Sequence, residues 1–390
     1  MLVSPRSGGG RQNGGVAEHV VRDYRPGAFL LAGPTSTLLA EGERAVVTES
    51  DPEELSARVE KALADSGAQV AVGALPFAPG APAHVVVPAA VSRAGSAHPS
   101  SVAPAAGAAP VSVTPVPSGA GYEAAVAAAV ALLRGPGELR KVVLARTLRL
   151  GFAAPVDLAA LLPGLVAANP QGHTFAAPLP GGRTLLGATP ELLVSRTGTR
   201  VVSNPLAGSL PRGVTPEQDR ALADELLASG KDQAEHRVVV EAVEEVLRPF
   251  CRSLHVPAGP SLVATPTVWH LSTRITGELA DPGVSALRLA AALHPTPAVC
   301  GAPAAAAAAA IAELEPFERG FYSGAVGWTG ADGDGEWVVS LRCAEVFDRE
   351  MLLYAGAGIM PASVPAAELA ETSAKFATLL RGLGIDLPGA

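Results

Sequence analysis

The residues YSGAVGWTGADGDGEWVVSLRCAEVFDREMLLYA, 322–355, carry the strongest indication of fold in this chain. Three runs within them, 322–329, 337–347 and 351–355, have the pattern of consecutive antiparallel strands. Two Asp-Gly pairs mark a turn between the first two runs. Elsewhere helical patterns and short strand runs mix, and several of the strands are expected to be hairpin partners. We therefore expect an α+β fold with large antiparallel sheets rather than a doubly wound parallel sheet.

Composition divides the chain into four parts. Residues 1–20 have the character of a disordered tail, and 21–91 contain short strand patterns and one helix. Residues 92–121 are rich in Ala, Pro, Ser and Gly with little periodicity, which predicts a surface linker. Residues 122–386 hold the remaining helices and strands, and they carry every candidate site residue described below.

The bulk properties exclude several classes of protein. The chain has 390 residues, 48% of them hydrophobic, which is ample for a large core. A net charge of −8 and only 4% aromatic residues argue against nucleic-acid binding. Three cysteines without a CxxC pair argue against a disulfide framework or a zinc site. The N-terminus lacks the apolar core of a signal peptide, and no apolar run is long enough to span a membrane. We expect a soluble cytoplasmic protein.

Two acidic pairs with the same spacing lie far apart in the chain. Asp232 and Glu235 form one pair, and Glu368 and Glu371 form the other. Both stretches have helical patterns, so each pair projects from one helical face with Cβ atoms about 5–6 Å apart. Oxygen ligands without nearby Cys or His suit a hard cation such as Mg²⁺. The alternative is an ordinary solvated helix face, which is the commoner origin of either pair taken alone.

Five further features could carry chemistry. Lys141 begins an apolar strand and could serve as a general base, or its side chain could simply reach solvent. Glu191, at a turn before an apolar strand, could be a general acid or an exposed turn residue. The Gly-containing segments 203–209 and 355–361 could approach an anion with their backbone, or be plain turns. Arg342 has the position of a residue within an apolar strand, where its guanidinium needs a carboxylate from the protein or from a substrate.

The remaining candidates are weak. None of the eight histidines shows a tight metal-binding spacing. Asp332 and Asp334 fit a hairpin turn better than a calcium loop, because the EF-hand pattern is incomplete. The segment 355–361 is not a dinucleotide-binding fingerprint, since Pro361 stands where the third glycine belongs.

Taken together, the motifs resemble those of the chorismate-utilising enzymes, and among these the isochorismate synthases of the siderophore and menaquinone type. The matching motifs occur in the order found in that family, over roughly residues 120–385: KVVLAR (141–146), LLGATPELL (185–193), SNPLAGS (203–209), KDQAEH (231–236), HLST (270–273), HPTPAVCG (294–301), RGFYSGAVGW (319–328), LRCAEV (341–346), AGAGIMPAS (355–363) and ELAETSAKF (368–376). Ten such motifs in order are strongly specific. The resemblance implies a single α+β unit with two large antiparallel sheets and helices packed outside.

The resemblance also implies an isomerase that converts chorismate to isochorismate. Lys141 matches the base that activates water, and Glu191 matches the acid that protonates the leaving hydroxyl. Water would add at one ring carbon of chorismate as the 4-hydroxyl departs. The residue types fit this activity, since a dianionic substrate needs a cation, an arginine and backbone donors to offset its desolvation.

The other matched residues bind the metal and the substrate. Glu235 and Glu371 match Mg²⁺ ligands, and Asp232 and Glu368 match residues that support the metal through water. The metal would hold the ring carboxylate. The residues that match substrate contacts are Arg342 and Tyr322 at the enolpyruvyl carboxylate, and Gly208, His270, Gly356 and Lys375 elsewhere.

Related activities remain as alternatives. Anthranilate synthases usually carry Gln where Lys141 stands, and aminodeoxychorismate synthases place a nucleophilic Lys where this chain has Ala207. Salicylate synthase, which eliminates pyruvate from isochorismate, shares the base, the acid and the metal site, and is the closest rival. A further alternative is a member of the family that binds an anion without catalysing a reaction. Ala145 and Thr189 replace a common Ser, and we expect neither to touch the acid–base pair. We expect a monomer that needs no glutaminase subunit.

Overall fold

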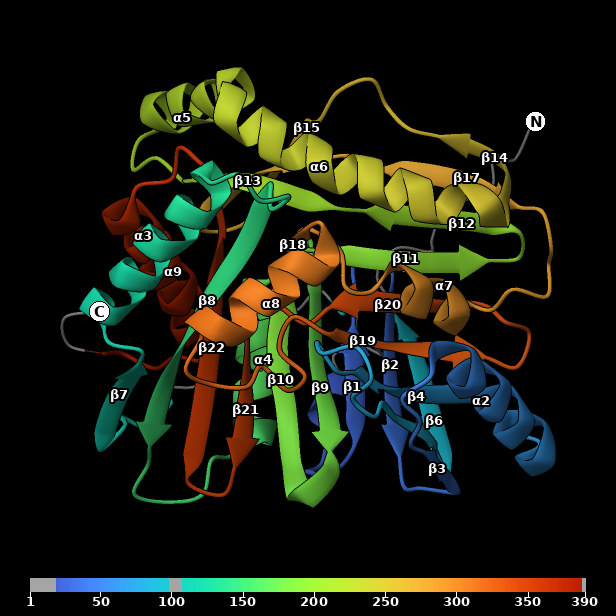
Figure 1. Cartoon of the computed structure of the whole chain (residues 1–390). Coiled ribbons are helices and arrows are strands. Elements are labelled where there is room, and N and C mark those ends of the chain that lie inside the picture. The colour runs from blue at the N-terminus through green and yellow to red at the C-terminus, as the bar shows by residue number, and fades with distance from the viewer. Residues whose placement is uncertain (1–18, 98–106, 388–390) are drawn as a thin grey trace, which may run out of the picture.

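The computed structural model describes residues 19–97 and 107–387 of the chain. Two large antiparallel sheets form its body, and a third, smaller sheet lies beside them (Figure 1). The first sheet has ten strands, in the order β18 (Gly301–Ala302), β8 (Lys141–Gly151), β22 (Glu350–Ile359), β21 (Cys343–Phe347), β10 (Arg183–Thr189), β9 (His173–Leu179), β1 (Phe29–Ala32), β2 (Ser36–Glu41) and β6 (Ala90–Gly95), with β7 (Ser112–Val116) paired to β8.

The second sheet has nine strands and crosses the first in Figure 1. Its order is β14 (Cys251–His255), β17 (Ile275–Leu279), β12 (Arg200–Asn204), β11 (Leu192–Thr197), β20 (Gly335–Val339), β19 (Ala325–Gly330), β4 (Val70–Leu75), β5 (His84–Val87) and β3 (Ala45–Val47). The small sheet, which the sequence did not reveal, contains β13 (Leu206–Pro211), β16 (Val268–Ser272) and β15 (Ser261–Ala264).

Helices cover the outer faces of both large sheets. They are α2 (Pro52–Ser66), α3 (Gly119–Arg134), α4 (Leu158–Ala168), α5 (Pro216–Ala228), α6 (Gly230–Leu247), α7 (Ala286–Leu293), α8 (Ala304–Leu314) and α9 (Pro365–Gly382), with short 3₁₀ turns at Pro180–Gly182 and Arg248–Phe250. Apolar residues of α4 and α9 pack on the first sheet, those of α2, α6 and α7 pack on the second, and α3 and α8 cover β8 and β22. The expected α+β architecture, with two large antiparallel sheets and helices outside, is confirmed.

The inner faces of the two sheets meet in a continuous apolar core. Phe29 and Phe175 of the first sheet and Val326 and Val338 of the second belong to this cluster, and all four are nearly or completely buried. Such packing of one sheet face on another is what holds the two sheets as one unit.

Helix starts follow local sequence signals. The Asp51 carboxylate accepts hydrogen bonds from the first backbone N–H groups of α2, where Pro52 is the first helical residue. Thr215 caps α5 in the same way, and Pro216 is its first helical residue. The Ser229 hydroxyl accepts from the N–H of Asp232 and begins α6. This last cap matters for function, because it fixes the turn that carries the first acidic pair.

The run 337–347 is not one strand, which corrects the sequence prediction. β19 and β20 form a hairpin in the second sheet, whereas β21 and β22 form a hairpin in the first. The chain crosses between the sheets at 340–342, and Arg342 adopts a left-handed backbone conformation with φ of 45°. The residues on both sides of the crossing are buried, so the apolar pattern continues through a bend that it cannot reveal.

The predicted linker at 92–121 is also wrong at both ends. β6 begins before it and pairs with β2, and β7 lies within it and pairs with β8. Both strands are largely exposed, so they lack the apolar alternation that marks a buried strand. Residues 98–106 lie outside the described residues, as do 1–18 of the expected tail.

The N-terminal part is not a separate region. β1 pairs with β9, and β4 pairs with β19, so residues before the linker belong to both large sheets. Val20, the last residue of the predicted tail, is buried in the apolar cluster that packs on the first sheet.

Candidate active site

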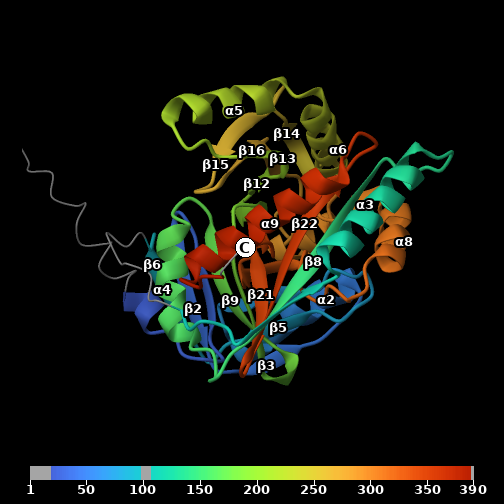
Figure 2. The same cartoon turned by 90° about the vertical axis from the view of Figure 1, so that its left-hand side faces the viewer.

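A cavity of about 410 Å³ lies among β13, β16, the start of α6, β22 and α9. In Figure 2 the small sheet and α5 lie above α9 and the end of β22. Eleven of the twelve residues singled out from the sequence line this cavity: Glu191, Gly208, Asp232, Glu235, His270, Tyr322, Arg342, Gly356, Glu368, Glu371 and Lys375. The twelfth, Lys141, lies behind its wall.

The two acidic pairs stand within the first two turns of two different helices. Asp232 and Glu235 belong to α6, and Glu368 and Glu371 belong to α9. Burial raises the pKa of Asp232, and the nearby charges of Glu235 and Glu371 raise it further. Burial and then Glu371 raise the pKa of Glu368. Glu371 of the second pair thus acts on Asp232 of the first across the cavity, which both pairs line.

The carboxylates are paired with lysines rather than gathered around one point. Nζ of Lys231 lies 3.3 Å from Oε1 of Glu368, and Nζ of Lys375 lies 2.7 Å from Oε1 of Glu371. Within residues 19–97 and 107–387, no three His, Cys, Asp or Glu side chains stand close enough together to hold an ion. The donors are all carboxylate oxygens, which fits a hard cation, but they would have to turn away from the lysines to bind one.

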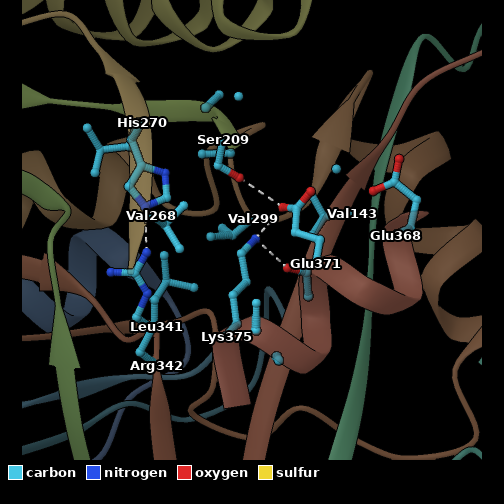
Figure 3. A pocket seen from close by; sticks show the side chains of 18 of the residues that line it. Val143, Ser209, Val268, His270, Val299, Leu341, Arg342, Glu368, Glu371 and Lys375 are labelled. Carbon is cyan, nitrogen blue, oxygen red and sulfur yellow. Dashed lines mark hydrogen bonds and ion pairs between the residues drawn. The ribbon is translucent and has the colours of Figure 1, made fainter. Parts of the chain in front are cut away.

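Two residues of this cluster were not singled out from the sequence. Lys231 lines the cavity, and the hydroxyl of Ser209 donates to Oε1 of Glu371 at 3.0 Å (Figure 3). Both stand inside quoted motifs, Lys231 directly before Asp232 and Ser209 at the end of 203–209. The position of Lys231 next to an acidic pair in the sequence was the signal that could have identified it.

Lys141 lies on β8 and is completely buried. Its Nζ is 3.0 Å from Oε1 of Glu235, without the geometry of a hydrogen bond. A Cβ added to Gly358, which lines the cavity, would lie 3.2 Å from Cε of Lys141 and 2.2 Å from Oε1 of Glu235. The ammonium group thus sits directly behind Gly358 and Glu235, which separate it from the cavity.

Glu191 projects into the cavity from the turn between β10 and β11, and its side chain is buried. Burial raises its pKa to about 7, although a backbone hydrogen bond at Leu206 and the charges of Lys141 and Arg342 act in the opposite direction. A carboxyl group that holds its proton near neutral pH suits a general acid. The expectation that Thr189 stays clear of this residue is wrong, because its hydroxyl accepts a hydrogen bond from the Glu191 N–H at 3.2 Å.

Arg342 faces His270 across the cavity from Glu371 (Figure 3). Its guanidinium donates to Nε2 of His270, and among the described residues it forms no ion pair with a carboxylate. Burial lowers its pKa to about 10, while the charges of Glu191 and Glu371 oppose the change. Burial, and then Arg342 itself, hold the pKa of His270 well below its ordinary value, so this imidazole is neutral and accepts. The protein leaves the arginine without the anionic partner that it requires.

Glycines and a tyrosine pair shape the rest of the wall. Gly208 has φ of 75°, and a Cβ there would lie 2.9 Å from Cβ of Asp232. A Cβ at Gly356 would lie 2.8 Å from the hydroxyl oxygen of Tyr322. The Tyr322 ring stacks on Tyr354 with 4.8 Å between centroids. These two glycines are therefore needed for close packing within the wall, which is a different reason from the backbone contact proposed for them.

A buried ion pair supports the wall at β8. On the side facing α8, β18 pairs with residues 141–142 and β7 with 147–151, and no described strand pairs with the residues between. The Glu315 carboxylate fills this gap by accepting from the Ala145 N–H at 2.7 Å, and Arg319 donates to the Val143 carbonyl at 2.8 Å. Glu315 and Arg319 also bond each other. Side chains thus take the place of a missing strand next to the cavity.

The sequence and fold were compared with known proteins. The family model described as "Chorismate binding enzyme" matches residues 91–384. The chain belongs to the chorismate-binding enzyme family. Isochorismate synthase DhbC of Bacillus subtilis is 48% identical over 386 residues, covering 95% of this chain and 97% of that protein. The resemblance inferred from the motifs is confirmed, and with it the expectation of an enzyme.

Solved structures of this enzyme family share the fold. A candidate 2,3-dihydroxybenzoate-specific isochorismate synthase, DhbC from Bacillus anthracis, superposes with a TM-score of 0.90 at 43% identity, covering 95% of this chain and 100% of that one. MenF, the menaquinone-specific isochorismate synthase from Escherichia coli, gives 0.81 at 26% identity, covering 95% and 91%. No helix within the described residues has the length and apolar character needed to cross a membrane.

Proposed function

We propose that this member of the family is an isochorismate synthase, which converts chorismate to isochorismate. The observation that carries the proposal is the convergence in one cavity of a buried acid, a buried guanidinium that forms no ion pair with a carboxylate of the described residues, and the four carboxylates of the two acidic pairs. The relatives named as isochorismate synthases support it over nearly the whole chain. The cavity also has the size range of a small-molecule site.

Chorismate carries two carboxylates, and the charged side chains of the cavity are divided between two sides that could each bind one of them. Arg342 and His270 lie on one side, and Glu368 and Glu371 lie on the other, where Lys375 donates a hydrogen bond to Glu371 (Figure 3). A guanidinium that has no carboxylate of its own binds one carboxylate of chorismate. With that carboxylate held, we assign protonation of the leaving 4-hydroxyl to Glu191, which lines the cavity, and activation of water to Lys141.

Proton transfer by Lys141 and Glu191 then completes the reaction. Lys141 accepts a proton from a water molecule while the oxygen of that water bonds to a ring carbon. Both ring double bonds shift by one position, the bond to the 4-hydroxyl breaks, and Glu191 donates its proton so that water leaves. One water enters and one departs, so substrate and product are isomers. The buried, near-neutral carboxyl of Glu191 is the group suited to this donation.

We also propose Mg²⁺ as the cofactor. Glu235 and Glu371 would hold it directly, and Asp232 and Glu368 would hold it through water. Bound there, the cation would supply charge neutralisation for the carboxylates and for a substrate carboxylate. Burial first, and the charge of Glu371 across the cavity in addition, raise the pKa of Asp232, and this gathering of carboxylates supports a cation at this place.

Chromatography of the products tests the proposal. Purified protein is incubated with chorismate and MgCl₂, with a parallel sample in EDTA. Isochorismate as the sole product supports the proposal, and loss of turnover in EDTA supports the metal. Salicylate with pyruvate would instead make the protein a salicylate synthase, and an absence of turnover would make it a binding protein only.

A further inference from the structure

A serine in the cavity wall has a strained backbone and an unused hydroxyl. Ser323 has φ of 60°, in the left-handed region that non-glycine residues rarely adopt. In the described residues only Arg342 and Asp348 share this property. Asp348 lies in the turn between β21 and β22, where such a conformation is common. The other two both line the cavity. Strain of this kind collects where the surrounding structure holds a functional group in place.

The hydroxyl of Ser323 is completely buried and has no hydrogen-bond partner in the described structure. The neighbouring Tyr322 hydroxyl interacts with it weakly, lowering the otherwise raised pKa of Tyr322, but the two do not reach hydrogen-bond geometry. Buried hydroxyls are normally hydrogen-bonded, because leaving one unpaired costs free energy. An orphan hydroxyl in a cavity wall therefore indicates a partner supplied by a ligand.

Backbone hydrogen bonds tie Ser323 to the segment that presents Arg342. The Ser323 N–H donates to the Ser340 carbonyl, and the Ser340 N–H donates to the Gly324 carbonyl, each at 3.0 Å. The Ser340 hydroxyl donates to the carbonyl of Phe321. A Cβ at Gly324 would lie 2.0 Å from the Leu75 carbonyl oxygen, so the bend has no freedom to relax. Ser323 and Arg342 are thus held in one rigid unit on one side of the cavity.

We propose that the Ser323 hydroxyl donates a hydrogen bond to the same substrate carboxylate that Arg342 binds. This rests on the proposed function, and adds a substrate-binding residue to it. A carboxylate bound by Arg342 is an anionic acceptor, and a hydroxyl gives a stronger hydrogen bond to an anionic acceptor than to a neutral one. The bond is present in the bound substrate and persists through the reaction, since this carboxylate is distant from the bonds that change. Its loss therefore raises KM and leaves kcat nearly unchanged.

Steady-state kinetics with chorismate tests this with two variants and one control. Ser323→Ala removes the hydroxyl and keeps the backbone strain, whereas Ser323→Gly removes both. Asp348→Gly is the matched control, because it relieves the same strain in a turn that does not line the cavity. We expect KM to rise by about tenfold or more in both Ser323 variants, with kcat changed by less than about twofold, and no change in the control.

The double variant Ser323→Ala/Arg342→Lys adds a second readout. If both groups bind one carboxylate, the two increases in KM are not multiplicative. Wild-type turnover with an unaltered KM in Ser323→Ala, or strictly multiplicative losses in the double variant, would overturn this inference and leave the proposed function standing. No turnover by the wild type would overturn both. A rise in KM confined to Ser323→Gly would show that backbone stiffness, and not the hydroxyl, matters, and would also overturn the inference.

Discussion

Replacing Glu191 by Gln separates the contribution of this acid to the reaction from its cost to the fold. The side chain is 3% exposed, and burial is the main cause of its raised pKa. Gln has nearly the same shape and cannot lose a proton. We expect kcat to fall by about 10²–10⁴-fold, the usual contribution of a general acid. In the wild type, kcat/KM should decline as the pH rises through about 7, because the acid must be protonated.

Glu191→Gln lowers kcat, but it is expected to raise the stability of the folded protein at high pH. Between the ordinary value of 4.5 and about 7, the folded protein holds a proton on Glu191 that the unfolded chain has released. Stability therefore falls as the pH rises through this interval, and the full cost is present above pH 7. At about 1.4 kcal/mol per pH unit, the interval corresponds to about 3 kcal/mol. Glu191→Gln removes this cost, so the variant should be more stable than the wild type at pH 8 and not at pH 4.5.

Urea unfolding at several pH values measures this difference. Glu313→Gln, the same substitution at an exposed position of α8, is the control and should leave turnover unchanged. A Glu191→Gln variant that loses activity and gains stability only at high pH supports both roles. Stability curves that run parallel in pH for variant and wild type would show that Glu191 is not a buried acid with a raised pKa.

Three further changes have defined outcomes. Lys141→Met should reduce kcat by about 10²-fold or more while Mg²⁺ binding persists by calorimetry, because Lys141 lies behind the carboxylates; retained turnover would remove it as the base. Arg342→Lys should raise KM for chorismate by about 10–100-fold, because a lysine loses the forked contact with a carboxylate; an unchanged KM would place the substrate elsewhere. Glu315→Ala should destabilise the protein by about 3–5 kcal/mol, because Arg319 is left buried and unpaired. The double variant Glu315→Leu/Arg319→Met should lose less stability, as measured by thermal unfolding. Equal losses in the two variants would contradict the role of the pair.

The acidic pairs were predictable because helix geometry is local. Spacing of three residues places Asp232 and Glu235 on one face, and the cap at Ser229 sets where that face begins. That the pair on α9 would face this one could not follow from spacing. It depends on how β22 and the small sheet bring the two helices together, which is a matter of tertiary packing.

Two other residues show where local reasoning stops. Arg342 was expected to need a carboxylate, since a buried guanidinium requires one, yet its place in a bend between sheets was hidden by apolar residues on either side. Lys141 was expected at the cavity, but its side chain points behind Gly358 and Glu235. The direction of a side chain at a strand end depends on which neighbours are packed against it. The exposed strands β6 and β7 were missed because edge strands bury too little to leave an apolar pattern.

A labelling experiment tests the central claim, that solvent water is added as the 4-hydroxyl leaves. Chorismate is incubated with the protein and Mg²⁺ in heavy-oxygen water, and the isochorismate formed is analysed by mass spectrometry. The account predicts one heavy oxygen in each product molecule, in the new hydroxyl group. Product that carries none would mean that the original hydroxyl migrates within the substrate, and Lys141 and Glu191 would have no water to activate and none to expel.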